Sequence, residues 1–123
     1  MEKEIYELYK TSNIEFDAEI NNYENSYCLN FLFESKEFKG YGPYYLDKVN
    51  EYIKQLFCMS ETLSGECCIF DTESTNNIRI FFENRSLFVK GTIGDYGQHL
   101  LSFSFRADQT LISALIRVLK KLL

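Results

Sequence analysis

The sequence predicts a single α+β domain over residues 1–123, in which an antiparallel β-sheet of about six or seven strands, in a meander, carries two amphipathic helices on one face. Two runs of short segments alternate apolar and polar residues, and a segment with helical spacing follows each run. The connections between strand segments are too short for crossover helices, so neighbouring strands must pair antiparallel. Such segregated runs favour an antiparallel sheet whose helices gather on one side.

The first run of strand segments precedes Pro43. Residues 14–20, IEFDAEI, alternate strictly and predict a half-buried strand. Residues 26–34, SYCLNFLFE, alternate in the same way and predict a second strand. After a turn at residues 35–36, we expect a shorter strand through Tyr41, and the run GYGP closes this part of the sheet.

After Pro43, apolar residues recur at three- and four-residue steps and predict an amphipathic helix of about 15 residues. They are Leu46, Val49, Tyr52, Ile53, Leu56 and Phe57. Ser64 and Gly65 break this helix. Four strand segments follow, ECCIF, NIRIFFE, SLFVKGTI and HLLSFSF, and turn residues such as Asn84 and Arg85 separate them. Their spacing predicts an antiparallel meander.

The closing helix begins at about Gln109, because an apolar stripe at helical spacing starts there. Asp108 comes immediately before that stripe, where a carboxylate accepts free N–H groups of the first helical turn. A catalytic group of Arg106, Asp108 and Thr110 is the alternative interpretation. The helix start explains Asp108 completely, so we predict a structural cap there.

Other candidate sites are weaker, and the sequence predicts neither an enzyme nor a bound cofactor or metal. The glycines of GTIGDYG lead into a strand, whereas a phosphate-binding loop leads into a helix, so a hairpin is favoured. His99 is the one histidine, and no nucleophile signature accompanies it. The chain has four cysteines and no CxxC pair, which disfavours a zinc site.

The formal net charge of −5 is concentrated in the first half of the chain, where residues 1–61 hold 12 acidic and 6 basic side chains. Residues 62–123 hold 6 acidic and 7 basic ones. An acidic surface repels phosphate, so we expect no direct nucleic-acid or membrane partner and instead a basic protein. No membrane span or signal-peptide core is visible, and we expect a cytoplasmic protein.

Two groups of residues are candidates for a protein contact. Glu15, Asp17 and Glu19 share one face of the first predicted strand and form a ladder of negative charge. That ladder is either a solvated outer face or a docking surface for a basic protein. Tyrosines and a hairpin tip add further contact candidates, although Tyr44 is also suited to packing under the first helix. These candidates are Tyr41, Tyr44, Asp95 and Tyr96.

The second half of the chain carries an ordered set of features. Ser64 and Gly65 follow the first helix, Gly91 to Ile93 end a strand, Phe103 and Phe105 alternate, and DQT opens a leucine-rich terminal helix. In this order and spacing the chain resembles the WapI-like immunity proteins of bacterial polymorphic toxin systems. The resemblance covers about residues 26–123, and residues 1–25 match only loosely.

This resemblance implies an immunity protein that neutralises a cognate toxin in the cytoplasm by stoichiometric binding, as a monomer or weak homodimer. The toxins of such systems include nucleases acting on tRNA, and an acidic inhibitor suits the basic surface of a nuclease. The family provides no catalytic residues to carry over. The alternative function is a small-molecule-binding or structural α+β domain that uses an aromatic pocket or a sheet edge.

Overall fold

Two antiparallel β-sheets and two helices make up the fold in a computed structural model that describes residues 3–21, 28–95 and 99–123. The elements are β1 (Lys3–Lys10), β2 (Ile14–Asn21), β3 (Cys28–Ser35), β4 (Lys39–Tyr45), α1 (Val49–Thr62), β5 (Glu66–Phe70), β6 (Asn77–Glu83), β7 (Ser86–Asp95), β8 (His99–Ala107) and α2 (Gln109–Lys121). The predicted α+β class is confirmed. Instead of one sheet of six or seven strands, two meanders of four strands form, β1-β2-β3-β4 (sheet A) and β5-β6-β7-β8 (sheet B).

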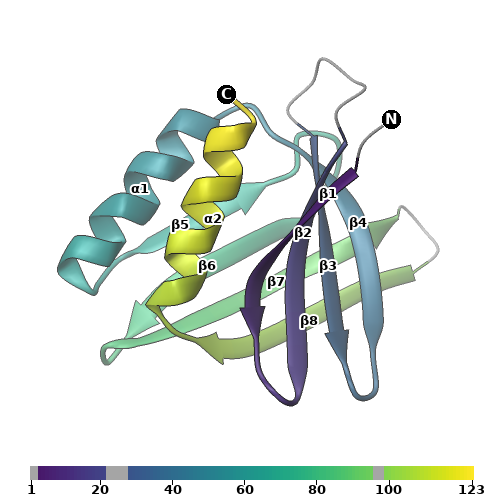
Figure 1. Cartoon of the computed structure of the whole chain (residues 1–123), viewed down its shortest axis with the longest axis horizontal. Coiled ribbons are helices and arrows are strands. Elements are labelled where there is room, and N and C mark those ends of the chain that lie inside the picture. The colour runs from purple at the N-terminus through teal and green to yellow at the C-terminus, as the bar shows by residue number, and fades with distance from the viewer. Residues whose placement is uncertain (1–2, 22–27, 96–98) are drawn as a thin grey trace.

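Sheet A and both helices lie on the same side of sheet B (Figure 1). Helix α1 packs on β5 and α2, and α2 also packs on β1, while β4 contacts β7 and β8. The two helices therefore cover one part of the inner face of sheet B, and sheet A covers the other. Two sheets form because sheet A also has an apolar face to bury, with the buried Phe16, Ala18 and Ile20 on β2.

Phenylalanine rings from the two sheets form the centre of the core. The rings of Phe33 in β3 and Phe103 in β8 stack with centroids 4.9 Å apart, and Phe16 stacks on Phe31 at 5.6 Å. Phe105 also packs on Phe16, at 5.5 Å. Such pairs contribute about 0.5–1.5 kcal/mol each beyond the area they bury. The alternating aromatics therefore hold the two sheets face to face.

A buried polar network ties the connection between β5 and β6 to the rest of the fold. Asp71 is only 7% exposed, and its carboxylate accepts the N–H of Tyr45 at 2.9 Å and the hydroxyl of Ser74 at 2.5 Å. Asn76 donates its side-chain N–H to the carbonyl of Gly94 at 3.1 Å. Because β4 belongs to sheet A and β7 to sheet B, this network joins the two sheets.

Two strand assignments go beyond the sequence prediction. Strand β1 was not expected, because its pairing register shifts between Glu7 and Tyr9 and this bulge interrupts the alternation of apolar residues. Strand β4 runs through GYGP to Tyr45, where the prediction closed the sheet segment. Pro43 is tolerated there because β4 is an edge strand of sheet A and needs hydrogen bonds on one side only.

Both predicted helices form. Helix α1 spans 14 residues and buries Val49, Tyr52, Leu56 and Met59. Phe57, which we placed on the apolar stripe, is 58% exposed, so that assignment was wrong. Helix α2 starts directly after Asp108, which confirms the predicted boundary.

Candidate functional site

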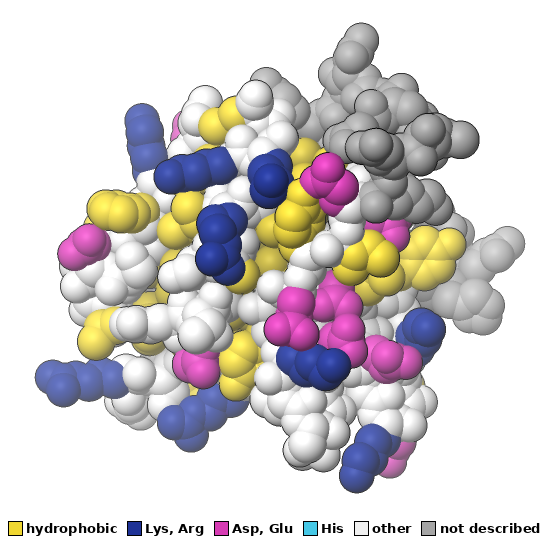
Figure 2. Space-filling view, in the orientation of Figure 1, with side chains coloured by type: hydrophobic (Ala, Val, Ile, Leu, Met, Phe, Trp, Pro, Cys, Tyr) yellow, Lys and Arg dark blue, Asp and Glu magenta, His cyan; other side chains and the backbone are white. Residues whose placement is uncertain are grey.

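The outer face of sheet A gathers carboxylates from three neighbouring strands. Glu15, Asp17 and Glu19 alternate with the buried residues of β2 and therefore point away from the core. The strand register places Glu7 of β1 opposite Asp17, and Glu34 of β3 opposite Glu15. We call these five residues the acidic face, and Figure 2 shows acidic side chains clustered over these strands. The predicted ladder is thus part of a wider acidic surface.

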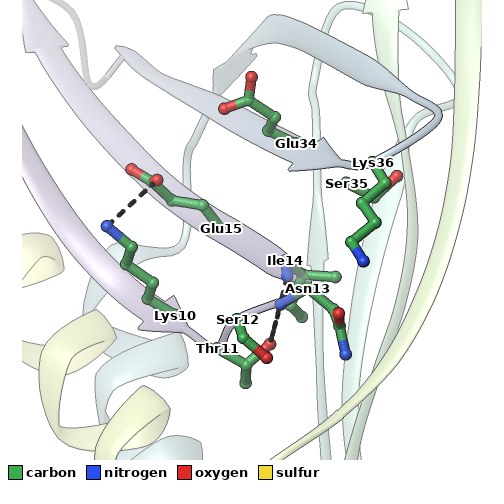
Figure 3. Close-up of a pocket in the computed structure, with 9 residues that line it drawn as sticks. All are labelled: Lys10, Thr11, Ser12, Asn13, Ile14, Glu15, Glu34, Ser35 and Lys36. Atoms are coloured by element: carbon green, nitrogen blue, oxygen red, sulfur yellow. Dashed lines mark hydrogen bonds and ion pairs between the residues drawn. The ribbon is translucent and has the colours of Figure 1, made fainter.

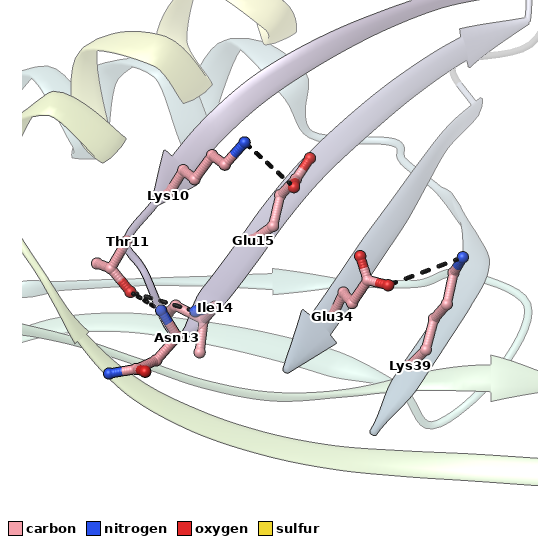
Figure 4. A network of polar contacts seen from close by, with 7 residues as sticks. All are labelled: Lys10, Thr11, Asn13, Ile14, Glu15, Glu34 and Lys39. Carbon is pink, nitrogen blue, oxygen red and sulfur yellow. Dashed lines mark hydrogen bonds and ion pairs between the residues drawn. The ribbon is translucent and has the colours of Figure 1, made fainter. Parts of the chain in front are cut away.

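Two lysines flank one end of the acidic face. The Nζ atom of Lys10 lies 3.7 Å from Glu15, and that of Lys39 lies 3.9 Å from Glu34 (Figure 4). Both pairs are exposed, where an ion pair contributes about 0–1 kcal/mol and screens only its immediate neighbours. Within the described residues, Glu7, Asp17 and Glu19 form no ion pair, so three carboxyl groups of the face have no basic side chain paired with them.

Asp17 occupies the middle of a row that crosses sheet A. Leu32 of β3 lies beside it, and Tyr41 of β4 follows at the end of the row. Tyr41 is 70% exposed. A surface groove of about 220 Å³ runs along this row. It is lined by Glu15, Asp17, Leu32, Phe33, Glu34, Lys39, Gly40 and Tyr41. Charged and aromatic groups are therefore adjacent in one depression.

A second depression, of about 240 Å³, lies between the β1–β2 turn and the end of β3 (Figure 3). The hydroxyl of Thr11 accepts the N–H groups of Asn13 at 3.1 Å and Ile14 at 3.2 Å, which fixes the turn. Glu15 and Glu34 line this depression as well as the groove. The two hollows therefore meet where Glu15 and Glu34 pair with Lys10 and Lys39.

The environment of Asp17 disfavours its negative charge. Burial, a hydrogen bond that its protonated form makes with Glu15, and repulsion from Glu15 and Glu7 raise its pKa to about 7, and Lys10 opposes this only in part. Two carboxyl groups hydrogen-bond to each other only through a proton. When Asp17 is ionised, its Oδ1 atom is buried without a hydrogen-bond partner. A cation brought beside this carboxylate would favour its ionised form.

One of the other contact candidates, Tyr44, does not lie on the surface. Tyr44 is fully buried, packs edge-on against Phe31 and donates its hydroxyl to the carbonyl of Thr92 at 2.5 Å, so it lies between the sheets and not on a contact surface. Burial raises the pKa of the Tyr44 phenol. Tyr96 and the side chain of Asp95 lie outside the described residues.

The joint between β8 and α2 has the geometry of a helix start. The Oδ1 atom of Asp108 accepts the N–H of Thr110 at 2.9 Å, as a helix cap does. The Thr110 hydroxyl donates to the same oxygen, and Lys120 and Lys121 occupy the last turn. Arg106 pairs with Phe88 of β7 and is exposed on sheet B. The helix start therefore accounts for the contacts of Asp108 and Thr110.

Sequence analysis missed two members of the acidic face, Glu7 and Glu34. Glu34 lies on the polar side of a strand that was predicted, so its position could have been found from the pairing of that strand with residues 14–20. Glu7 belongs to β1, which the bulge concealed. The pairing register of the strands therefore brings these carboxylates together, and no local sequence motif encodes the site.

No protein-family model matches this sequence, and no curated protein or solved structure matches the chain. The likeness to WapI-like immunity proteins therefore stays a prediction. Among the described residues, no helix is long and apolar enough to cross a membrane, and no group of three or more His, Cys, Asp or Glu side chains could hold a metal ion.

Proposed function

We propose that this chain is an immunity protein that binds a cognate bacterial toxin through the acidic face and neutralises it by stoichiometric contact in the cytoplasm. The observation that carries this proposal is the convergence of Glu7, Glu15, Asp17, Glu19 and Glu34 on one open sheet surface. The ordered features shared with WapI-like immunity proteins supply the class of partner. The proposal needs no catalytic residue and no cofactor.

Electrostatics favours a basic partner at this surface. On the acidic face, Glu15 and Glu34 are paired with Lys10 and Lys39, whereas Glu7, Asp17 and Glu19 form no ion pair within the described residues. A nuclease presents a basic surface because it must hold a phosphate backbone. Complementary fields of this kind raise association rates and suppress wrong partners. Rapid capture is valuable when the free toxin is lethal.

The groove beside Asp17 is suited to receive a basic side chain from the toxin. A lysine or arginine there would lie beside the Asp17 carboxylate, stabilise its negative charge and contact the exposed ring of Tyr41. Aromatic and charged residues of this kind are typical binding hot spots. We therefore assign the centre of the interface to Asp17 and Tyr41.

The packing of the core favours this function over a small-molecule pocket lined by aromatics. Phe16, Phe31, Phe33, Phe103 and Phe105 stack on one another between the sheets. The groove and the depression described above lie at the surface, and charged side chains line both. Protein contact suits such a surface better than ligand enclosure.

The proposal is tested by mixing the purified protein with the toxin domain encoded next to it. Size-exclusion chromatography with light scattering should show an equimolar complex, and the toxin should lose activity. Tyr41→Ala should weaken binding about tenfold or more. Phe57→Ala is the matched control, because Phe57 is an exposed aromatic on α1, away from sheet A. Absence of a complex, or equal effects of the two variants, would contradict the proposal.

A further inference from the structure

The outer face of sheet B is open and differs in chemistry from the acidic face. Both helices and sheet A lie on the other side of this sheet (Figure 1). Strands β6, β7 and β8 present Arg79, Phe81, Phe88, Lys90 and Arg106 on the outer side, since these residues alternate with the buried Ile80, Val89 and Ala107. We call these five residues the basic aromatic face.

Two phenylalanines form the middle of this face. Phe81 and Phe88 are direct partners on the adjacent strands β6 and β7, and their rings stack with centroids 5.7 Å apart and an interplanar angle of 27°. Both side chains are half-buried, and no other helix or strand covers them. The guanidinium of Arg79 lies over the Phe81 ring, 4.1 Å from its centre. The guanidinium and the two rings thus form one stack on the outer face of the sheet, with the Phe88 ring at the end away from Arg79.

Three cations and two carboxylates, Glu66 and Glu83, lie around the two rings. Arg79 and Lys90 are direct cross-strand partners, and like charges in that position repel. Arg79 is paired with Glu66 at 2.6 Å. In the described part of the chain, Lys90 and Arg106 make no ion pair. An anion spanning this row would relieve the repulsion and neutralise both unpaired cations.

We propose that the basic aromatic face binds single-stranded nucleic acid. A base would stack on Phe88, and phosphates would contact Lys90 and Arg106, which make no ion pair within the described residues. Single strands are bound in this way on open sheets, because every base has a face that can stack and the cations follow the backbone. The face would bind many nucleotide sequences, since no side chain needs to hydrogen-bond to the edges of the bases.

The Phe88 ring favours a nucleic acid over an acidic protein, because carboxylates would engage the cations and leave this ring without a stacking partner from the ligand. The net charge of −5 does not oppose this inference. The acidic face belongs to sheet A, and its outer side faces the opposite direction from the outer side of sheet B (Figure 1). The inference does not depend on toxin binding.

Fluorescence anisotropy with labelled single-stranded RNA and DNA of about ten nucleotides, at low salt, tests the proposal directly. The intact protein should bind both. Phe88→Leu should weaken binding about tenfold, whereas Phe88→Tyr, which keeps a stacking ring, should not. Lys90→Ala and Arg106→Ala should each make the plot of log binding constant against log salt concentration less steep, by about the amount that one phosphate contact contributes. Lys39→Ala, which removes a cation from sheet A, is the control and should change nothing.

Three results would overturn the proposal. The first is no anisotropy change at low salt. The second is equal binding by Phe88→Leu and Phe88→Tyr while circular dichroism shows both to be folded. The third is binding of a labelled poly-glutamate peptide as tight as that of RNA, since this would identify the face as a docking surface for acidic proteins. Because Lys90 and Arg106 are exposed, their variants test the face without disturbing the core.

Discussion

Replacing Asp17 by asparagine should stabilise the free protein at alkaline pH and change its stability little in acid. Asparagine has nearly the same shape but carries no charge, and its N–H can donate to the Glu15 carboxylate, as the proton on Asp17 does. At alkaline pH, the wild-type protein instead holds an ionised carboxylate with a buried oxygen that lacks a partner. The substitution removes that unfavourable arrangement.

The magnitude follows from the pKa of Asp17, which the fold raises from 3.8 to about 7. The folded protein holds the proton to higher pH than the unfolded chain, so this stabilising contribution is complete below about pH 4 and is lost as the pH rises through about 7. For a group fully shielded from water, the shift corresponds to about 4 kcal/mol. Asp17 is only half-buried, and solvent screening reduces the effect to about 1–2 kcal/mol.

Urea denaturation of wild-type protein and Asp17→Asn at about pH 4 and about pH 8 measures this difference. The free energy of unfolding of the variant should exceed that of the wild type at the higher pH only. Glu19→Gln is the control, since it removes a negative charge from the same strand and face, and it should have a smaller effect. A destabilised variant at about pH 8, or the same difference at both pH values, would refute this account of the Asp17 environment. The same substitution should weaken toxin binding.

Three further substitutions test other parts of the structure. Asp71→Ala removes the acceptor for Tyr45 and Ser74 and should cost about 3 kcal/mol in urea denaturation; a loss below about 1 kcal/mol would contradict its role in joining the sheets. Asp108→Ala should cost about 1 kcal/mol and leave toxin affinity unchanged, and a folded variant that no longer binds would restore the site interpretation. Tyr44→Phe should cost about 1 kcal/mol without affecting toxin affinity, whereas a binding defect in a folded protein would place Tyr44 in the interface.

Local patterns predicted most of the elements because each depends on neighbours in the sequence. The alternation in residues 14–20 and the apolar stripe that ends at Leu122 reflect the repeats of a strand and a helix. Asp108 is equally local, since a cap bonds to the N–H two residues further on. Strand β1 was not predicted, because its bulge interrupts the two-residue repeat of apolar side chains that is typical of a strand.

The division into two sheets and the composition of the acidic face depend on pairing, which local patterns do not encode. Glu7 and Asp17 become neighbours only through the register of β1 and β2. Tyr41 and Tyr44 are three residues apart on one strand, yet one is 70% exposed and the other is fully buried. Strand alternation predicts their separation onto opposite faces once β4 is known to extend through GYGP.

Charge segregation also arises from the fold. The sequence shows an acidic first half, which forms sheet A and nearly all of α1, and a second half of nearly balanced charge, which forms sheet B and α2. The average of −5 therefore conceals two outer faces of different character. The distribution of charge in space, and not the net charge alone, determines which partners a surface attracts.

The association rate of the toxin with two charge-reversed variants tests the central claim most directly. Glu19→Lys lies on the acidic face, and Glu83→Lys makes the same change in net charge on sheet B, at the end of β6. Stopped-flow measurements at low salt should show association slowed about tenfold by Glu19→Lys and nearly unchanged by Glu83→Lys. Equal rates for the two variants, or a slower rate for Glu83→Lys alone, would show that the acidic face is not the surface that captures the toxin.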